Sequence, residues 1–129
     1  MKKIYLKVTP AYQETEDMIF TYAVYDENET FIEKKELFHE YRKPVLASLF
    51  AVSMVLKELR PYRSEEIQII VNDGALIDEI NGTTQTKNRD VLKVADLTRQ
   101  SIRKFSDTIS LVSVAGDHQA KLNWDSKLS

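Results

Sequence analysis

The feature that most constrains this fold is a change of hydrophobic period in the first half of the chain. Residues 4–8 alternate between apolar and polar, and residues 18–25 are rich in aromatic and β-branched side chains. Both patterns indicate strands. Apolar residues then cover most of the circumference of a helix expected over 43–60, with Pro44 in its first turn and Pro61 at its end. A helix this apolar is expected to be buried on more than one side.

The rest of the chain alternates between short strands and helices. Residues 67–71 (IQIIV) form a continuous apolar run, which is typical of an interior parallel strand. A second long helix is expected over 89–105, with its apolar side chains on one face. The remaining expected elements are a charged strand over 30–37, a short helix over 75–80 ended by Asn81 and Gly82, a strand over 109–115, and a short C-terminal segment anchored by Trp124.

This order of elements predicts one α/β domain over residues 1–129. The first three strands form a meander, which favours antiparallel pairing, and the later strands follow helices, which favours parallel pairing. We therefore predict a five-stranded mixed sheet in the order 3-2-1-4-5, with only the second strand antiparallel to the rest. Helices are expected on both faces, because the helix at 43–60 and the strand at 67–71 are apolar throughout.

Composition excludes several classes of protein and site. The chain has no cysteine, which excludes disulfides, zinc–thiolate sites and thiol catalysis. Its glycines form neither a phosphate loop nor a dinucleotide motif, and no Gly-x-Ser-x-Gly motif is present. No apolar run approaches the roughly 18 residues of a membrane span, and no signal peptide is evident. We therefore expect a cytoplasmic protein with no membrane partner. Because the net charge is −2, any basic surface for nucleic acid must be local.

The order and spacing of these elements resemble the ribonuclease H-like fold over nearly the whole chain. The resemblance rests on the strand that closes on Asp73 and Gly74, on the short helix after it, and on Asn123 and Asp125 near the C-terminus. In that family, carboxylates on the first strand, the first long helix, the fourth strand and a C-terminal helix share two metal ions. The resemblance therefore implies an ancestor with metal-dependent chemistry.

Only the last two family positions carry a carboxylate here. The resemblance matches them to Asp73 and Asp125, and it places His118 in the loop where many members carry a mobile histidine. The first-strand position falls near Thr9 and the first-helix position near Val45, neither of which is acidic. The alternative is structural: Asp73 would cap the short helix that follows it, and Asp125 would be an ordinary surface or capping residue.

The missing carboxylates bear directly on the implied chemistry. Two-metal hydrolysis needs several carboxylates to hold two divalent ions about 3.5–4 Å apart. Magnesium binds proteins weakly, so the number of carboxylates sets its affinity. Asp73 and Asp125 would hold at most one loosely bound Mg²⁺ or Mn²⁺, so no resident cofactor and no catalytic residue is expected. If hydrolytic activity remains, Asp73, Asp125 and His118 are the residues that would carry it.

Basic residues on the second long helix are the candidates for contact with nucleic acid. They form a rough stripe along one side of the helix, made of Arg89, Lys93, Arg103 and Lys104 and interrupted by Asp96. A stripe of this kind offers charge to phosphates but no pattern that reads bases. An ordinary solvated helix face is the commoner cause of such a stripe.

Two classes of function follow from the sequence. The first is a ribonuclease H-like domain without hydrolytic activity that acts as a binding module. Its ligand would be nucleic acid, bound weakly and without sequence preference, or a protein partner. The alternative is a metal-dependent nuclease with a reduced or altered active site.

Overall fold

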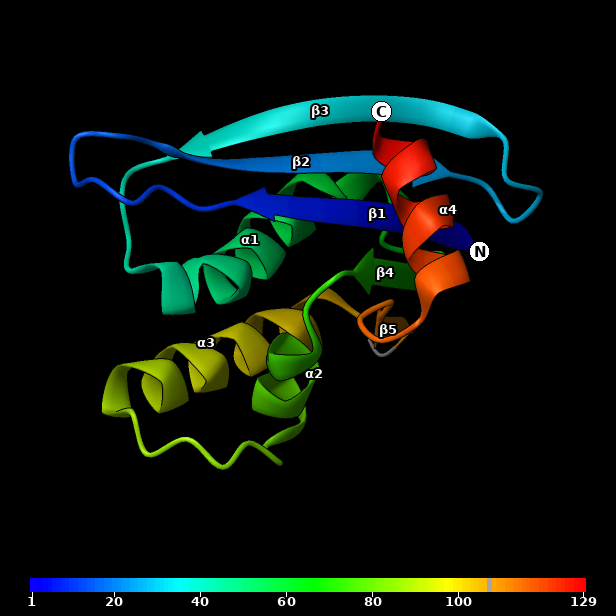
Figure 1. Ribbon diagram of the computed structural model, residues 1–129. Helices are drawn as coiled ribbons and strands as arrows, with labels where there is room; N and C mark the ends of the chain where they lie inside the picture. The colour runs from blue at the N-terminus through cyan, green and yellow to red at the C-terminus, as the bar shows by residue number, and fades with distance from the viewer. Residues whose placement is uncertain (107) are drawn as a thin grey trace.

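The computed structural model describes residues 1–106 and 108–129 and shows a five-stranded sheet with helices on both faces (Figure 1). A first meander leads into an alternation of helices and strands. The elements are β1 (Lys2–Thr9), β2 (Met18–Tyr25), β3 (Phe31–His39), α1 (Pro44–Glu58), the 3₁₀ helix η1 (Arg60–Tyr62), β4 (Ile67–Val71), α2 (Gly74–Asn81), α3 (Arg89–Phe105), β5 (Ile109–Ser113) and α4 (His118–Leu128).

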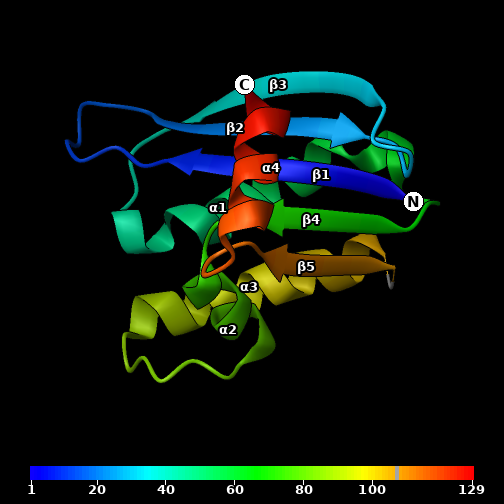
Figure 2. The ribbon, with the colours of Figure 1, turned by 45° about the vertical axis from the view of Figure 1, so that its right-hand side comes forward.

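The strand order is β3-β2-β1-β4-β5, which confirms the predicted order (Figure 2). β2 is antiparallel to β1 and β3, whereas β4 is parallel to β1 and β5 is parallel to β4. Only the second strand therefore opposes the others, as predicted. The C-terminal ends of β1 and β4 consequently meet at the same edge of the sheet, where the α1 helix also begins (Figure 1).

Element boundaries differ from the expected ones only at ends. The third strand runs on to His39, because β2 continues to pair with it as far as Met18 opposite His39. The first long helix ends at Glu58, and Pro61 lies in the 3₁₀ turn that follows. In α3, the Asn88 side chain caps the first turn by accepting from two backbone N–H groups. None of the described helices is long and apolar enough to cross a membrane.

Two apolar layers hold the helices on the sheet. The larger layer lies between one sheet face and α1, α2 and α3, and it includes Leu6, Phe20 and Leu49, all essentially inaccessible to solvent. The smaller layer lies under α4 and joins Tyr5, Ala23, Ile70, Val114, Trp124 and Leu128. α1 is buried on several sides, as expected from its composition, because it touches both the sheet and α3.

Trp124 anchors α4 as predicted. Its indole N–H donates to the backbone oxygens of Leu6, at 3.1 Å, and Ile70, at 3.2 Å. This bond pair ties the helix to β1 and β4 at once, and the indole itself is buried. The fixed position of α4 matters because the helix forms one side of the cleft described below.

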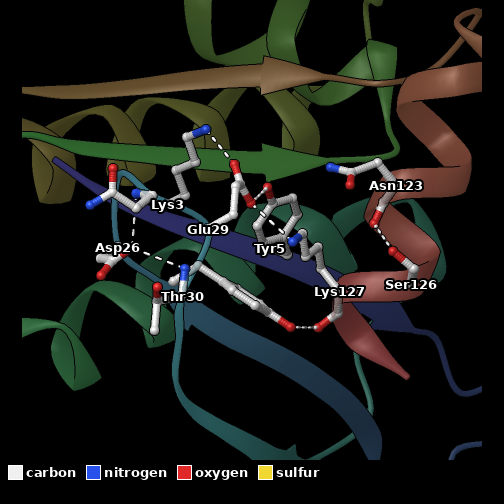
Figure 3. Close-up of polar contacts among 10 residues, drawn as sticks. Lys3, Tyr5, Asp26, Glu29, Thr30, Asn123, Ser126 and Lys127 are labelled. Carbon is white, nitrogen blue, oxygen red and sulfur yellow. Dashed lines mark hydrogen bonds and ion pairs between the residues drawn. The ribbon is translucent and has the colours of Figure 1, made fainter.

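A cluster around Glu29 fixes the other end of α4 (Figure 3). Glu29 sits in the β2–β3 turn with a left-handed backbone, φ 62°, and its carboxylate accepts from Lys3 and from the Tyr5 hydroxyl, the latter at 2.9 Å. The Lys127 ammonium lies 3.2 Å from the same carboxylate, and the Lys127 backbone oxygen accepts from Tyr25 at 2.9 Å. Burial raises the pKa of the Glu29 carboxyl, but the bonds from Lys3, Tyr5 and Lys127 outweigh it, and the net pKa is lowered.

Candidate functional site

A cleft of about 380 Å³ opens where β1 and β4 end and α1 begins. Its polar lining comes from Lys7 on β1, Tyr12 in the loop after it, Ser48 on α1, and the Asn72–Asp73 pair after β4. Trp124 of α4 contributes an apolar wall. Crevices at the carboxyl ends of parallel strands are common ligand sites in α/β proteins, so this cleft is the first candidate for function.

Asp73 is the acidic residue of the cleft lining, and both of its carboxylate oxygens accept hydrogen bonds. Oδ1 accepts from the Leu76 backbone N–H at 3.1 Å, which makes Asp73 the N-cap of α2. Oδ2 accepts from the Ser48 hydroxyl at 2.7 Å. The Asp73 backbone N–H donates in turn to the Ser113 hydroxyl at 3.1 Å. The carboxylate is therefore already part of the structure, as the capping alternative predicts.

The sequence did not single out Ser48, because the corresponding position of the ribonuclease H-like fold falls in the first turn of α1. That turn holds no acidic residue. Ser48 lies one helical turn after Pro44, so both face the same way, and both line the cleft. The four-residue spacing from Pro44 was the available signal. This spacing identifies Ser48 as a cleft residue only when the packing of α1 beside the end of β4 is known.

The other wall of the cleft carries a cation and no carboxylate. Lys7, Val8 and Pro10 line the cleft from the end of β1, and Lys7 is exposed to solvent. Over residues 1–106 and 108–129, no group of three or more His, Cys, Asp or Glu side chains is placed to hold a metal ion. The donor set at this cleft is one carboxylate, with hydroxyl and amide groups, and it does not fit a pair of divalent ions.

Asp125 and His118 lie on α4, beside the cleft rather than in its lining. Trp124, the residue before Asp125, faces the sheet, and Asp125 is exposed. His118 is the first residue of α4 and is also exposed, whereas Asp117 before it caps the helix by accepting from Ala120 N–H at 3.1 Å. The structure thus places Asp73 alone of the three candidates among the residues that line the cleft.

A buried acid near the cleft was not anticipated. Glu79 on α2 is only 8% exposed, and its backbone oxygen accepts from Arg99 at 2.8 Å. Burial raises the pKa of the Glu79 carboxyl, and the negative charges of Asp73 and Asp78 raise it further. The sequence offered no signal for this buried acid, because a glutamate in a short amphipathic helix is usually exposed.

The predicted basic stripe is exposed along the outer face of α3. Arg89, Lys93, Arg103 and Lys104 all face solvent, and the opposite face of the helix, with Val91, Ala95, Thr98 and Phe105, is buried. Asp96, which interrupts the stripe, accepts from Gln100 at 3.0 Å and pairs with Arg99 at 3.5 Å. Its negative charge is therefore already partly compensated within the helix.

The stripe runs the length of the molecule. α1 and α3 begin at the same end and pack side by side (Figure 1), so Arg89 lies toward the cleft end and Arg103 about 21 Å further along the helix. At the far end Lys104 joins a second hollow, of about 370 Å³, with Lys57, Arg60 and Arg63. Arg63 there donates to the backbone oxygens of Lys104 and Phe105, at 2.7 and 2.8 Å. These cations offset the partial negative charge of two helix C-termini, which accounts for their clustering there without a ligand.

Comparison with solved structures identifies the fold. The chain superposes on RNase H1 from the halophilic archaeon Halobacterium salinarum NRC-1 with a TM-score of 0.76 and 10% sequence identity, covering 97% of this chain and 92% of that chain. LC11-RNase H1, isolated from compost by a metagenomic approach, gives a TM-score of 0.77 at 10% identity, covering 98% and 91%. The same LC11 protein in complex with an RNA/DNA hybrid gives 0.75 at 11% identity, covering 94% and 90%. The fold is therefore ribonuclease H-like. No protein-family model and no curated protein matches the sequence.

Proposed function

We propose that this chain is a ribonuclease H-like binding module for nucleic acid that does not hydrolyse its ligand. The observation that carries the proposal is the set of charged side chains that line the cleft. Its one acidic lining residue, Asp73, is bonded to Ser48 and to the first turn of α2, and Lys7 lines the wall at the end of β1. This arrangement lacks the carboxylates that would hold two metal ions, and the charge of Lys7 offsets that of Asp73, so the cleft does not repel a phosphate.

The stripe on α3 supplies a surface for the same ligand. Its exposed cations, Arg89, Lys93, Arg103 and Lys104, extend from the cleft end toward the far end of the helix. Contacts of this kind fix the path of a phosphate backbone but read no bases. We expect the binding to be weak, because the net charge of the chain is −2. It should be sequence-independent and should fall steeply with salt, because contacts to phosphates release counterions. A solved relative of the fold, LC11-RNase H1, holds an RNA/DNA hybrid, which supports a nucleic-acid ligand.

The first experiment measures binding by fluorescence anisotropy. Labelled single-stranded, duplex and hybrid oligonucleotides are titrated with the chain at low salt, with Mg²⁺ and with EDTA. Arg89→Glu and Arg103→Glu should each weaken binding, and each lost contact should reduce the salt slope by about 0.9 for a duplex. Lys121→Glu is the matched control, because this exposed lysine lies on α4, across the sheet from α3. Absence of binding to all three oligonucleotides at tens of micromolar protein would overturn the proposal in favour of a protein partner.

A second experiment tests the absence of hydrolysis. The chain is incubated with an RNA/DNA hybrid at neutral pH with Mg²⁺ or Mn²⁺, and no cleavage is expected. Cleavage that is lost in both Asp73→Asn and Asp125→Asn would show that these residues form a working metal site. The chain would then be the reduced nuclease of the alternative hypothesis.

A further inference from the structure

The β3 edge of the sheet is long, exposed and partly apolar. β3 is the outermost strand at one end of the sheet and spans nine residues, whereas β5 at the other end spans five. Three large apolar side chains on β3 are open to solvent: Phe31 at 55%, Ile32 at 40% and Phe38 at 61%. The outer side of an edge strand also leaves backbone N–H and C=O groups unpaired, which makes it a template for another strand.

The opposite charges of Lys34 and Glu36 lie one residue to either side of Lys35, so an antiparallel copy of β3 can place each of them opposite the other. Lys34 lies opposite Ala23 and Glu36 opposite Thr21 in the β2–β3 register. Because Ala23 packs under α4, Lys34, Glu36 and Phe38 all belong to the sheet face that carries α4. Ile32 precedes Lys34 by two residues and lies at the irregularity in the pairing. Phe31 pairs with Tyr25, which packs under α4, so Phe31 belongs to this face and Ile32 is the extra residue of the irregularity. Along this face the strand therefore presents the apolar residue Phe31, a cation, an anion and the apolar residue Phe38.

We propose that two copies of this chain pair through β3, antiparallel, with Lys35 opposite its own copy across a two-fold axis. In this register Lys34 faces Glu36 of the second copy and Glu36 faces its Lys34. At each end Phe38 lies beside the irregular segment of the other copy, with Phe31 and Ile32. Opposite charges and apolar neighbours across a strand pair are stabilising. The two sheets join into one, and the interface closes as a dimer.

Neighbouring symmetric registers are mismatched. A shift that centres the pair on Lys34 places that lysine against its own copy and Ile32 against Glu36. A shift that centres it on Glu36 places two glutamates together and sets Lys34 against Phe38. Like charges directly opposite are destabilising. The charges thus oppose indiscriminate edge pairing, as they do on many exposed strands. Of these three registers, only the one centred on Lys35 sets Lys34 against Glu36.

The opposite face of β3 tolerates the same register. There Lys35 meets its own copy, which on its own is unfavourable. Glu58 of α1 lies 3.9 Å from the Lys35 ammonium, however, and supplies a compensating negative charge on each side. In the chain as described, Lys34 and Glu36 take part in no ion pair with residues 1–106 or 108–129. Their side chains therefore remain available to a second copy.

Charge exchange between the two positions provides the test. Sedimentation equilibrium at low salt measures the mass of the intact chain at up to about 0.2 mM, with a dimer expected for the wild type. Lys34→Glu and Glu36→Lys each place like charges together twice per dimer, and each should raise the dissociation constant at least about tenfold. An equimolar mixture of the two variants should dimerise again, because every glutamate then faces a lysine. The double variant Lys34→Glu/Glu36→Lys should dimerise as well.

Matched controls separate register from net charge. Lys121→Glu and Glu14→Lys make the same charge changes at exposed positions away from β3, and both should leave the dimer intact. Circular dichroism verifies that the β3 variants are folded. A wild-type chain that stays monomeric throughout, or variants whose mixture fails to restore the dimer, would overturn the proposal. Loss of dimer in the control variants would do the same, because it would attribute self-association to overall charge.

Discussion

Replacement of Asp73 by alanine distinguishes a structural carboxylate from a metal ligand. The change removes the N-cap bond to Leu76 and the acceptor of the Ser48 hydroxyl. Loss of an N-cap costs about 1 kcal/mol. A hydrogen bond to a charged group contributes about 1.5–3 kcal/mol, and the lower end applies because Asp73 and Ser48 are only half-buried. We therefore expect Asp73→Ala to lower the free energy of unfolding by about 2.5 kcal/mol.

Two matched variants isolate the parts of this effect. Asp117→Ala removes the exposed N-cap of α4, which accepts from Ala120 alone, so its cost should stay near 1 kcal/mol. Asp73→Asn keeps a side chain that caps well and should cost less than Asp73→Ala. A double-mutant cycle with Ser48→Ala should give a coupling energy of about 1 kcal/mol between Ser48 and Asp73.

The assay is urea unfolding at pH 7 followed by circular dichroism, without metal and with millimolar Mg²⁺. If Asp73 has only a structural role, the urea midpoint of unfolding should be the same without and with Mg²⁺. An increase in wild-type stability with Mg²⁺ that disappears in Asp73→Asn would refute it, because a ligand that binds the native state stabilises that state. An Asp73→Ala cost no greater than that of Asp117→Ala would refute the contribution of the Ser48 bond.

Three further outcomes are expected. Leu49 is fully buried on α1, so Leu49→Ala should lower the free energy of unfolding in urea by about 2–5 kcal/mol. Val45 on the same helix is 53% exposed, so Val45→Ala should lower it far less. Because the pKa of Glu29 is lowered on folding, its charged form stabilises the native state fully above the unfolded-state pKa of 4.5, and this stabilisation is lost as the pH falls below 4.5. Below pH 4.5, Glu29→Gln should therefore lose less stability than the wild type in an acid titration. Because the pKa of Glu79 is raised on folding, the native state loses stability as the pH rises above 4.5. Glu79→Gln should therefore be more stable than the wild type at pH 7 and equally stable near pH 3. Equal stability of the two proteins at both pH values would contradict the burial argument.

The elements of this fold could be predicted because each carries its own hydrophobic period. The all-round apolar helix near Leu49 and the apolar strand at 67–71 indicate burial on two sides without any knowledge of the neighbours. The order of strands then follows from the short meander and the handedness of the crossovers. Trp124 was also predictable as an anchor, because a lone large aromatic in a polar segment has few other places to be buried.

The contacts of the site were less accessible to sequence reasoning. Ser48 and Asp73 are 25 residues apart, and their bond exists only because α1 begins beside the end of β4. Glu29, a turn residue with a left-handed backbone, binds Lys3 and Tyr5 of β1 and Lys127 of α4. No local sequence pattern specifies these tertiary contacts, because each residue type is common at its position in a strand, turn or helix. Tertiary packing decides which of several polar residues become neighbours.

The charge of the side chains that line the cleft bears on the proposed binding of nucleic acid. A site with four carboxylates and no metal repels phosphate, so such a site needs divalent ions before a nucleic acid can approach. In this chain the ionic side chains that line the cleft are Lys7 and Asp73, whose formal charges cancel. A phosphate can therefore approach without a metal, and over residues 1–106 and 108–129 no group of three or more His, Cys, Asp or Glu side chains is placed to hold a metal ion. If the chain binds nucleic acid without metal, as we propose, its affinity in EDTA should equal its affinity in Mg²⁺ at matched ionic strength, whereas a metal-dependent site would bind more tightly in Mg²⁺.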